Sequence, residues 1–473
     1  MNKERMKSIV LLSLVIMSFV LTTRIWFNIS IEGLFVMPQN KQTLQEALTY
    51  DKESLLKPSK MVVHTEQIHT LIFNTDKDKE YYKFILYGAK DTMRDWLTNY
   101  ESYTLSSLPK ENLRQIRESR AVELIFDYQM ELTNIKSLLD IENNSWSDIT
   151  NITSVIIAPN ESKIYIVDKD KKSIYQITSS QMPTVLTGVI TEIEKRNDHD
   201  YLFLNMFNDE TYDLYGDYAI APVSIATMPS LAVKSEIEIG TTPDPKVLDF
   251  FDGDSSNISS VRDIDGKITY TDREEENVTI DVQGALEYYK YNVTTNDTKS
   301  VGVKEAIDIA TQYVNEHMEF THDFYLSNVE RTTQGGRTSY IISFDYKYGG
   351  IPIITELDTG SSAIEVEILG QEVKRYKRNV RVIEDQGKSI NIKSFSDILD
   401  IVWGNLDTKL NTTKSESIVV LNDLYLAYIE RNAALIPIWV VEVTVEDNEN
   451  KQNNRKFFIG AEEGEIGVIL DEQ

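Results

Sequence analysis

The sequence contains no cysteine, and it has only 11 prolines and 20 glycines in 473 residues. The absence of cysteine excludes disulfide bonds, thiol catalysis and cysteine-ligated zinc or iron–sulfur sites. Proline and glycine are too scarce for a fibrous or disordered chain, and hydrophobic residues make up 41% of the sequence. A chain of this length and composition has the material for about two to four folded domains.

Positive charge is scarce as well. The 48 lysines and arginines stand against 75 aspartates and glutamates, which gives a formal net charge of -27. Nucleic-acid phosphates and anionic lipid headgroups repel so acidic a surface, so nucleic-acid binding is a poor interpretation. The charge is explained well enough by solubility.

A long apolar run lies at the N-terminus. Residues 8–27 carry a single charge, Arg24, and supply the roughly 20 residues that a helix needs to span a bilayer. Basic residues precede the run, which predicts a cytoplasmic tail at 1–7 and a single-pass cell-membrane protein with its bulk outside the cytoplasm. We expect Arg24, Trp26 and Phe27 to anchor the helix at the membrane interface. A cleaved signal peptide stays open as an alternative, although no Ala-x-Ala-like site follows.

Beyond a juxtamembrane connector at 28–42, the pattern predicts an α+β exterior of several domains. Residues 43–295 mix strand-like and helix-like segments, and they form either one domain or two subdomains. The strands predicted here include Lys60–His64, Tyr82–Leu86, Ala121–Phe126 and Thr187–Asp213, and Lys90–Tyr100 is predicted as a helix.

The last third of the chain repeats a small α+β unit. In the first copy, at 299–385, an amphipathic helix over Lys304–His317 is followed by strand-like segments. In the second copy, at 388–473, a helix over Ser394–Leu406 again precedes strands. Both copies therefore read as a helix plus an antiparallel sheet, which indicates internal duplication.

One motif is similar to the catalytic Asp-Thr-Gly of aspartic proteases. It is Asp358-Thr359-Gly360. That chemistry needs two aspartates that share a proton, and the sequence has no second Asp-[Ser/Thr]-Gly. We therefore interpret the motif as a turn.

No metal or cofactor site is predicted. The five-residue spacing of His64 and His69 is not the i, i+4 spacing of a helical zinc site, so the histidines are interpreted as structural or surface residues. His317 and His322 would need a special loop to reach a metal together. Residues 252–257 lack the central glycine and closing glutamate of a calcium loop and are interpreted as an ordinary turn. No cofactor is expected.

Three stretches of the sequence together resemble the YycH family of extracytoplasmic regulators. They are the N-terminal apolar run at 7–27, the segment FFDGDSSNISSVRDIDGKITYTDREEENVTIDVQG at 250–284, and IPIWVVE at 436–442. The resemblance extends in order along the whole chain. It implies that the two C-terminal units are PepSY-like folds, as in the sibling protein YycI.

The resemblance also implies a function. Members of this family associate with a sensor histidine kinase of the WalK type and with YycI, and they regulate cell-wall homeostasis without catalysis. Contacts are expected through the transmembrane helix and the exterior domains. The candidate helix contacts on this reading are Leu11, Leu14, Val15, Ser18 and Leu21.

Two other functions stay open. The chain could be an anchored ligand- or cell-wall-binding module, or a PepSY-like protein that restrains a peptidase. An extracytoplasmic hydrolase is disfavoured because no nucleophile motif such as G-x-S-x-G is present. A regulator should need its own transmembrane sequence, whereas a binding module should tolerate any anchor.

Overall fold

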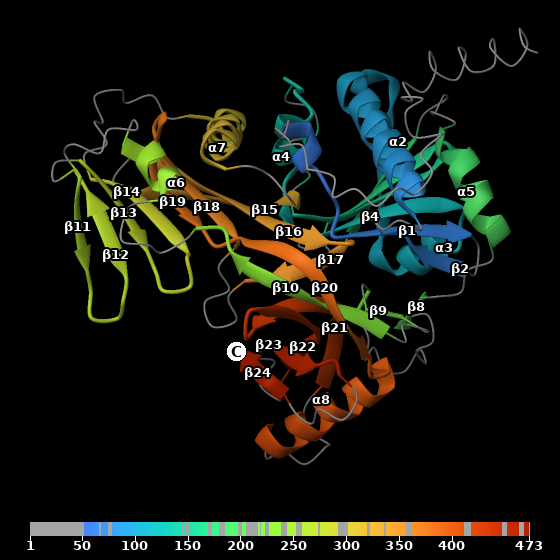
Figure 1. Cartoon of the computed structure of the whole chain (residues 1–473). Coiled ribbons are helices and arrows are strands. Elements are labelled where there is room, and N and C mark those ends of the chain that lie inside the picture. Colours follow the sequence, from blue (N-terminus) through green and yellow to red (C-terminus); the bar gives the residue numbers. More distant parts are fainter. Residues whose placement is uncertain are drawn as a thin grey trace, which may run out of the picture. The chain divides into compact units, whose positions relative to one another are not determined.

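The computed structural model gives a mixed α/β protein in which two large sheets dominate (Figure 1). It describes residues 52–472, and residues 1–51 and 473 lie outside the description. Within 52–472 the undescribed residues are 66–67, 74–77, 144–145, 147–148, 150, 169–172, 179–184, 197–200, 205–215, 218, 223–226, 238–243, 252–257, 273–274, 292–300, 319–321, 335–336, 356–361, 411–417, 447–451 and 463–467.

The first sheet has nine strands from the N-terminal half of the chain. They are β1 (Lys60–Thr65), β2 (Ile68–Leu71), β3 (Thr104–Pro109), β4 (Ala121–Met130), β5 (Ile152–Ala158), β6 (Lys163–Asp168), β7 (Ser173–Thr178), β8 (Tyr201–Phe203) and β9 (Ile220–Pro222). Their order in the sheet is β3-β7-β6-β5-β4-β1-β2-β8-β9. Successive side chains of β5 enter different cores, because Val155 and Ile157 belong to the main core while Ile156 packs near Leu113 and Ile116. Both faces of this sheet are therefore covered.

Helices pack against the first sheet because their apolar residues recur every three or four positions. In α2 (Lys79–Thr98) the buried side chains include Ile85, Ala89, Met93 and Trp96, which line one helical face. The helix α5 (Val185–Arg196) lies beside α2 (Figure 1). The short elements of this half are η2 (Lys52–Leu55), η3 (Tyr100–Ser102), η4 (Lys110–Asn112), α3 (Leu113–Arg117), α4 (Leu132–Leu138) and η5 (Pro159–Glu161).

The second sheet has fifteen strands. They are β10 (Thr227–Ser235), β11 (Ser259–Arg262), β12 (Ile268–Thr271), β13 (Glu276–Ile280), β14 (Leu286–Lys290), β15 (Asp323–Gln334), β16 (Arg337–Tyr348), β17 (Ile351–Ile354), β18 (Ile364–Leu369), β19 (Glu372–Arg378), β20 (Arg381–Asn391), β21 (Ile418–Arg431), β22 (Ala434–Glu446), β23 (Gln452–Gly460) and β24 (Val468–Glu472). The main path runs β11-β12-β13-β14-β19-β18-β16-β17-β21-β22-β10-β20, with β15 paired to β16 and with β23 and β24 continuing from β22.

The same order of elements occurs twice in the C-terminal half. The helix α7 (Val303–His317) precedes the antiparallel strands β15, β16, β18 and β19, and α8 (Phe395–Leu410) precedes the antiparallel strands β21 to β24. The parallel pair of β17 with β21 joins the two copies into one sheet. Each segment thus has a helix followed by antiparallel strands, while internal duplication of one unit stays a prediction. The PepSY-like identity of that unit stays a prediction as well.

The first C-terminal copy is packed on its helix. The face of α7 that contains Ala306, Ile307, Ala310 and Val314 is buried, and α7 lies along β16, β18 and β19 (Figure 1). The strand β18 alternates buried and half-buried residues, as a strand with one covered face should. Two short elements, α6 (Pro245–Leu248) and η7 (Asp249–Phe251), precede this copy.

Two predicted strands are wrong. Tyr82–Leu86 lies inside α2, and the first part of Thr187–Asp213 lies inside α5. Both segments are rich in aromatic or β-branched residues, which favours strands locally. Tertiary packing overrides that preference, because the buried residues of α5 are Leu186, Ile190 and Ile193, at helical spacing.

The chain divides into two compact units, Met1–Glu46 and Ala47–Gln473, and all described residues belong to the second. The domain boundaries predicted within the second unit stay predictions. Among the described helices, none combines the length and the apolar character that a bilayer span requires. The segment predicted to span the membrane, 8–27, lies outside the described residues.

Candidate functional site

The first described segment, residues 52–60, is held in place by three of its own lysines, Lys52, Lys57 and Lys60. We call residues 52–60 the lead-in segment. Lys57 forms an ion pair with Asp323 of β15 and donates to the Phe324 carbonyl at 2.9 Å. Lys60, at the start of β1, pairs with Asp423 of β21. The chain is therefore fixed to the second sheet as it enters the first.

Further contacts fix the lead-in segment from both sides. The Nζ atom of Lys347 in β16 donates to the Pro58 carbonyl at 3.1 Å and to the Ser59 carbonyl at 2.8 Å. Ser59 in turn donates its backbone N–H to the Ile125 carbonyl of β4 at 2.8 Å. Because these groups are mostly buried, a shift of this segment would leave charged and polar groups without partners.

Lys52 ties the lead-in segment to two helices. Its Nζ atom lies 2.5 Å from Asp140, just after α4, and 2.8 Å from Asp308 of α7. Burial by itself would lower the pKa of Lys52, but hydrogen bonds and charges from Asp140 and Asp308 outweigh it and raise that pKa. Lys304 of α7 also reaches Asp140, at 3.4 Å. The contact between α4 and α7 is thus charged as well as apolar.

A buried polar network lies in the middle of the first sheet. His64 and His69 are cross-strand partners in β1 and β2, and their Nδ1 atoms are 2.8 Å apart. The Nε2 atom of His64 lies 3.0 Å from Glu123 of β4. Arg117 of α3 donates to both carboxylate oxygens of Glu123, at 2.8 and 2.9 Å. All four side chains are buried, and Phe203 of β8 lies against the Arg117 guanidinium, 4.1 Å from ring centroid to Cζ.

The charges of this network are set by its burial. Burial, which outweighs the attraction of Glu123, lowers the pKa of His64, and burial lowers the pKa of His69 to about 3. Burial would raise the pKa of Glu123, but Arg117 and His64 hold it well below its usual range. At neutral pH the network is therefore a neutral histidine pair beside a Glu–Arg ion pair. Such a network gives structural specificity and couples α3 to three strands.

The histidine pair could have been found from the sequence. A spacing of five residues places two side chains directly opposite each other when a two-residue loop joins the strands. The register pairs Thr65 with Ile68, which leaves this two-residue loop. The loop is Glu66-Gln67, which lacks the Asn-Gly or Asp-Gly signal of a tight hairpin, so the five-residue spacing is the one local indication of the pair. Among the residues described, no three acidic or histidine side chains converge to hold a metal ion.

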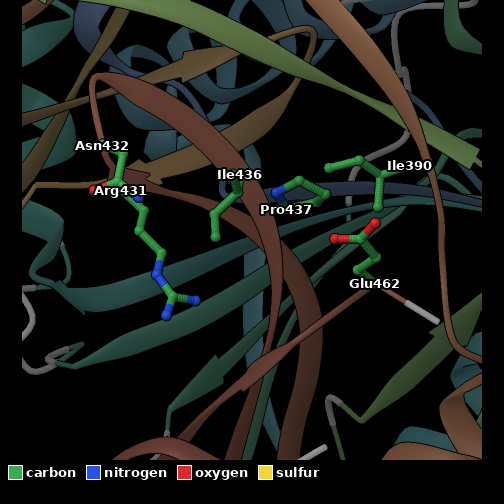
Figure 2. Close-up of a pocket in the computed structure, with 6 residues that line it drawn as sticks. All are labelled: Ile390, Arg431, Asn432, Ile436, Pro437 and Glu462. Atoms are coloured by element: carbon green, nitrogen blue, oxygen red, sulfur yellow. The ribbon is translucent and has the colours of Figure 1, made fainter. Parts of the chain in front are cut away.

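A pocket of about 280 Å³ lies at the β21–β22 hairpin. Its lining residues are Ile390, Arg431, Asn432, Ile436, Pro437 and Glu462. Figure 2 shows the side chains of Arg431 and Glu462 on opposite sides of Ile436 and Pro437. The pocket thus combines an apolar floor with one basic and one acidic wall. Its volume is near the lower limit for small-molecule sites, so it suits a side chain or the end of a peptide.

The hairpin beside this pocket has an unusual backbone. Asn432 and Ala433 both have positive φ, 53° and 56°, as a two-residue type I′ turn requires. Alanine is disfavoured in this conformation, because its Cβ approaches the following carbonyl. The Ala433 carbonyl accepts the backbone N–H of Val233 in β10 at 3.1 Å. The strained turn is therefore held by a contact to the neighbouring strand.

The other residues singled out in the sequence lie apart from these sites. Asp358-Thr359-Gly360, between β17 and β18, is outside the described residues, but the neighbouring Ser362 lies 3.3 Å from Ser327 between hydroxyl oxygens. His317 and His322 contact the carbonyls of Tyr313 and Arg381. Residues 252–257 also lie outside the described residues, as do the candidate membrane residues Leu11, Leu14, Val15, Ser18, Leu21, Arg24, Trp26 and Phe27.

Comparison with known proteins covers most of the chain. Residues 4–185 match the N-terminal domain of the YycH protein, and residues 250–451 match its C-terminal domain. The crystal structure of YycH from Bacillus subtilis is similar, with a TM-score of 0.55 and 15% sequence identity over 86% of this chain and 98% of that chain. At this identity the structural similarity establishes the fold alone. Curated protein sequences give no match. Because both domain models match in order along the chain, this protein belongs to the YycH family.

Proposed function

We propose that this protein is a non-catalytic, membrane-anchored regulator of a sensor histidine kinase of the WalK type. Membership of the YycH family implies a regulator of this two-component system, and the match to both family domains carries the proposal. The partners proposed are the kinase itself and a YycI-like membrane protein. The contacts run through the apolar segment 8–27 and through the exterior domains.

The lead-in segment supports a mechanical role for the exterior. Lys57 and Lys60 pair with Asp323 and Asp423 of the second sheet, and Ser59 is hydrogen-bonded to Ile125 of the first, so the lead-in segment is fixed to both sheets. We propose that a partner that reorients the exterior also moves the lead-in segment, where the described exterior begins. A kinase with two packings of its membrane helices changes output when a neighbour favours one packing. A coupling of about 1–3 kcal/mol changes that equilibrium roughly 5- to 150-fold.

A co-purification from detergent-solubilised membranes tests this proposal. The tagged full-length protein is compared with a version in which residues 8–27 are replaced by an unrelated apolar span of equal length. We expect the natural chain to recover a sensor kinase and a YycI-like protein. Replacement of the span should abolish recovery of the kinase. Stoichiometric recovery of neither protein would exclude the regulator proposal.

The lead-in segment provides a second arm of the same experiment. Lys57→Met and Lys60→Met loosen the attachment of the exterior while the span stays natural. We expect these variants to keep the kinase bound but to change its autophosphorylation in reconstituted membranes. The matched variant Lys163→Met removes an exposed ion pair with Glu161 and should leave kinase output unchanged.

The pocket favours a second candidate function, an anchored ligand-binding module. Arg431 and Glu462 stand on opposite sides of an apolar floor, which suits a zwitterionic ligand such as a short peptide end (Figure 2). Calorimetric titration with a soluble cell-wall peptide, repeated with Glu462→Gln and Arg431→Gln, tests this function. Equal heats for the natural chain and both variants would exclude it.

A further inference from the structure

The second sheet ends in an exposed strand and turn. The strand β11 pairs with β12 on one side, and no described strand lies on its other side. Residues 260–265 are all exposed, from the strand into the turn that follows it. Val261 is 65% exposed and Ile264 is 100% exposed. A run of this kind on an otherwise well-packed sheet needs a physical reason.

The turn after β11 has a counterpart in the neighbouring hairpin. Asp263-Ile264-Asp265-Gly266 joins β11 to β12, and Asp281-Val282-Gln283-Gly284 joins β13 to β14. In both turns the glycine donates its N–H to the aspartate carbonyl at 3.0 Å and has positive φ, 84° and 82°. Each turn therefore holds an aliphatic residue at the same position. That residue is Ile264 in one turn and Val282, which is 63% exposed, in the other.

The two turns touch each other. A Cβ atom at Gly266 would lie only 2.7 Å from Cγ1 of Val282, so the glycine leaves room for the valine. Ile264 and Val282 are thus presented together by two ordered turns. We call residues 260–265 together with Val282 the tip surface.

The edge of β11 that faces away from β12 offers backbone groups beside this apolar tip, since no strand among the described residues pairs with it. Asp263 donates its N–H to the Lys267 carbonyl at 2.8 Å, which closes the hairpin with a hydrogen-bonded pair. Because such pairs alternate along antiparallel strands, Val261 bonds toward β12, while Ser260 and Arg262 direct their backbone N–H and C=O groups outward. An extended partner segment can pair with these groups.

Charge indicates what kind of segment fits. In residues 258–272 and 275–291, seven acidic residues stand against three basic ones. Three of the acidic residues, Asp263, Asp265 and Asp281, belong to the two turns. This charge disfavours a second copy of the same surface and an anionic membrane. It favours basic side chains in the partner.

We propose that the tip surface is a docking site for an extended segment of another protein that carries aliphatic and basic side chains. The segment adds a strand to β11 through Ser260 and Arg262 and covers Ile264 and Val282. This inference is independent of the identity of the kinase and of the pocket at the β21–β22 hairpin.

Peptide probes and the full-length protein in nanodiscs of neutral lipid test the proposal. The probe is a fluorescent peptide of about ten residues that alternates valine and lysine, and the matched peptide has glutamate in place of lysine. We expect the lysine peptide to bind, with an affinity that falls as salt is raised, and the glutamate peptide to bind at least about tenfold more weakly. Equal binding of the two peptides, or of neither, would overturn the proposal.

Three variants locate the binding. Ile264→Ser with Val282→Ser removes the apolar tip, and Ser260→Pro removes an outward N–H while the bonds of β11 to β12 remain. Each should weaken the lysine peptide about tenfold. Tyr87→Ser removes a side chain of similar exposure, 66%, from α2 and should change nothing. Unchanged affinity in the tip and edge variants would overturn the proposal. So would a tip-dependent affinity for phosphatidylglycerol vesicles in place of the peptide, because it would assign the tip to the membrane.

Discussion

The Nδ1 atoms of His64 and His69 face each other at 2.8 Å, in a hairpin where both side chains are buried. One of these nitrogens must carry a proton and the other must accept it. A second proton on the pair would place two N–H groups against each other in a buried site, where burial first and then the neighbouring positive charges oppose it. The contact is therefore specific to the neutral pair.

The first prediction is a loss of stability in acid. The pKa of His69 is lowered from 6.5 to about 3 in the folded protein. The neutral form of His69 therefore contributes its full stabilisation to the free energy of unfolding above pH 6.5, and this stabilisation is lost progressively as the pH falls toward 3. The slope is about 1.4 kcal/mol per pH unit for such a histidine. His69→Leu should remove the share of His69 from the slope of the unfolding free energy against pH, measured with urea between pH 7.5 and 4.5, while the share of His64, whose pKa burial also lowers, remains.

A packing variant separates titration from simple damage. Phe203→Leu disturbs the same site without removing a titrating group. The curve of its unfolding free energy against pH should therefore run parallel to that of the natural protein. If the His69→Leu curve also runs parallel, His69 does not titrate as proposed.

The second prediction concerns the lead-in segment. Lys60 and Asp423 are only 9% and 13% exposed, so removing one partner leaves a nearly buried charge. Lys60→Met should lower the free energy of unfolding by about 3 kcal/mol, and adding Asp423→Leu should restore most of it. Lys163→Met, at an exposed pair, should cost less than about 1 kcal/mol. A double variant as unstable as the single one would show that the uncompensated charge is not the cause.

The third prediction contrasts two glycines. Gly216 donates its N–H to the Leu421 carbonyl at 2.5 Å, and a Cβ there would lie 2.9 Å from the Asn422 Cα. Gly216→Ala should therefore cost about 1–3 kcal/mol by forcing two backbone segments apart. A Cβ at Gly188 in α5 meets nothing within 4 Å, so Gly188→Ala should stabilise the helix by up to about 1 kcal/mol. Thermal unfolding of both variants measures the contrast, and melting temperatures that shift in the same direction would contradict it.

The fourth prediction tests the strained hairpin. Ala433 has a φ of 56°, which glycine adopts freely, so Ala433→Gly should stabilise the protein by about 0.5–1 kcal/mol. Ala434→Gly, one residue further and within β22, should destabilise it by a similar amount. Chemical denaturation gives both values, and destabilisation by Ala433→Gly would show that the turn is not strained.

The sequence correctly predicted those helices and strands in which the hydrophobic residues recur at the spacing of the element that forms. The helix expected at Ser394–Leu406 is α8, and the strands expected at Lys60–His64 and Ala121–Phe126 are β1 and β4. The segments that failed are those in which strand-prone residues occupy a buried helical face, as Ile190 and Ile193 do in α5.

Contacts between distant segments had no local signal. The pairing of Leu231 with Leu435, and the ion pair of Lys60 with Asp423, join residues far apart in the sequence. Each residue looks ordinary in its own neighbourhood, and only the fold brings it to its partner. The sequence therefore could not predict the continuous sheet or the lead-in contacts, whereas it did predict a helix followed by strands in each C-terminal segment.

The position of β10 between β20 and β22 has a consequence for biosynthesis. Ribosomes make β10 long before either neighbour, so its final partners become available only when β20 (Arg381–Asn391) and then β22 (Ala434–Glu446) have been made. An unpaired strand can associate with other chains, and charge or proline within it opposes this. The strand β10 contains both a proline, Pro229, and a charged residue, Lys234. The composition of β10 thus opposes association of the nascent chain with other chains until its C-terminal strands have been made.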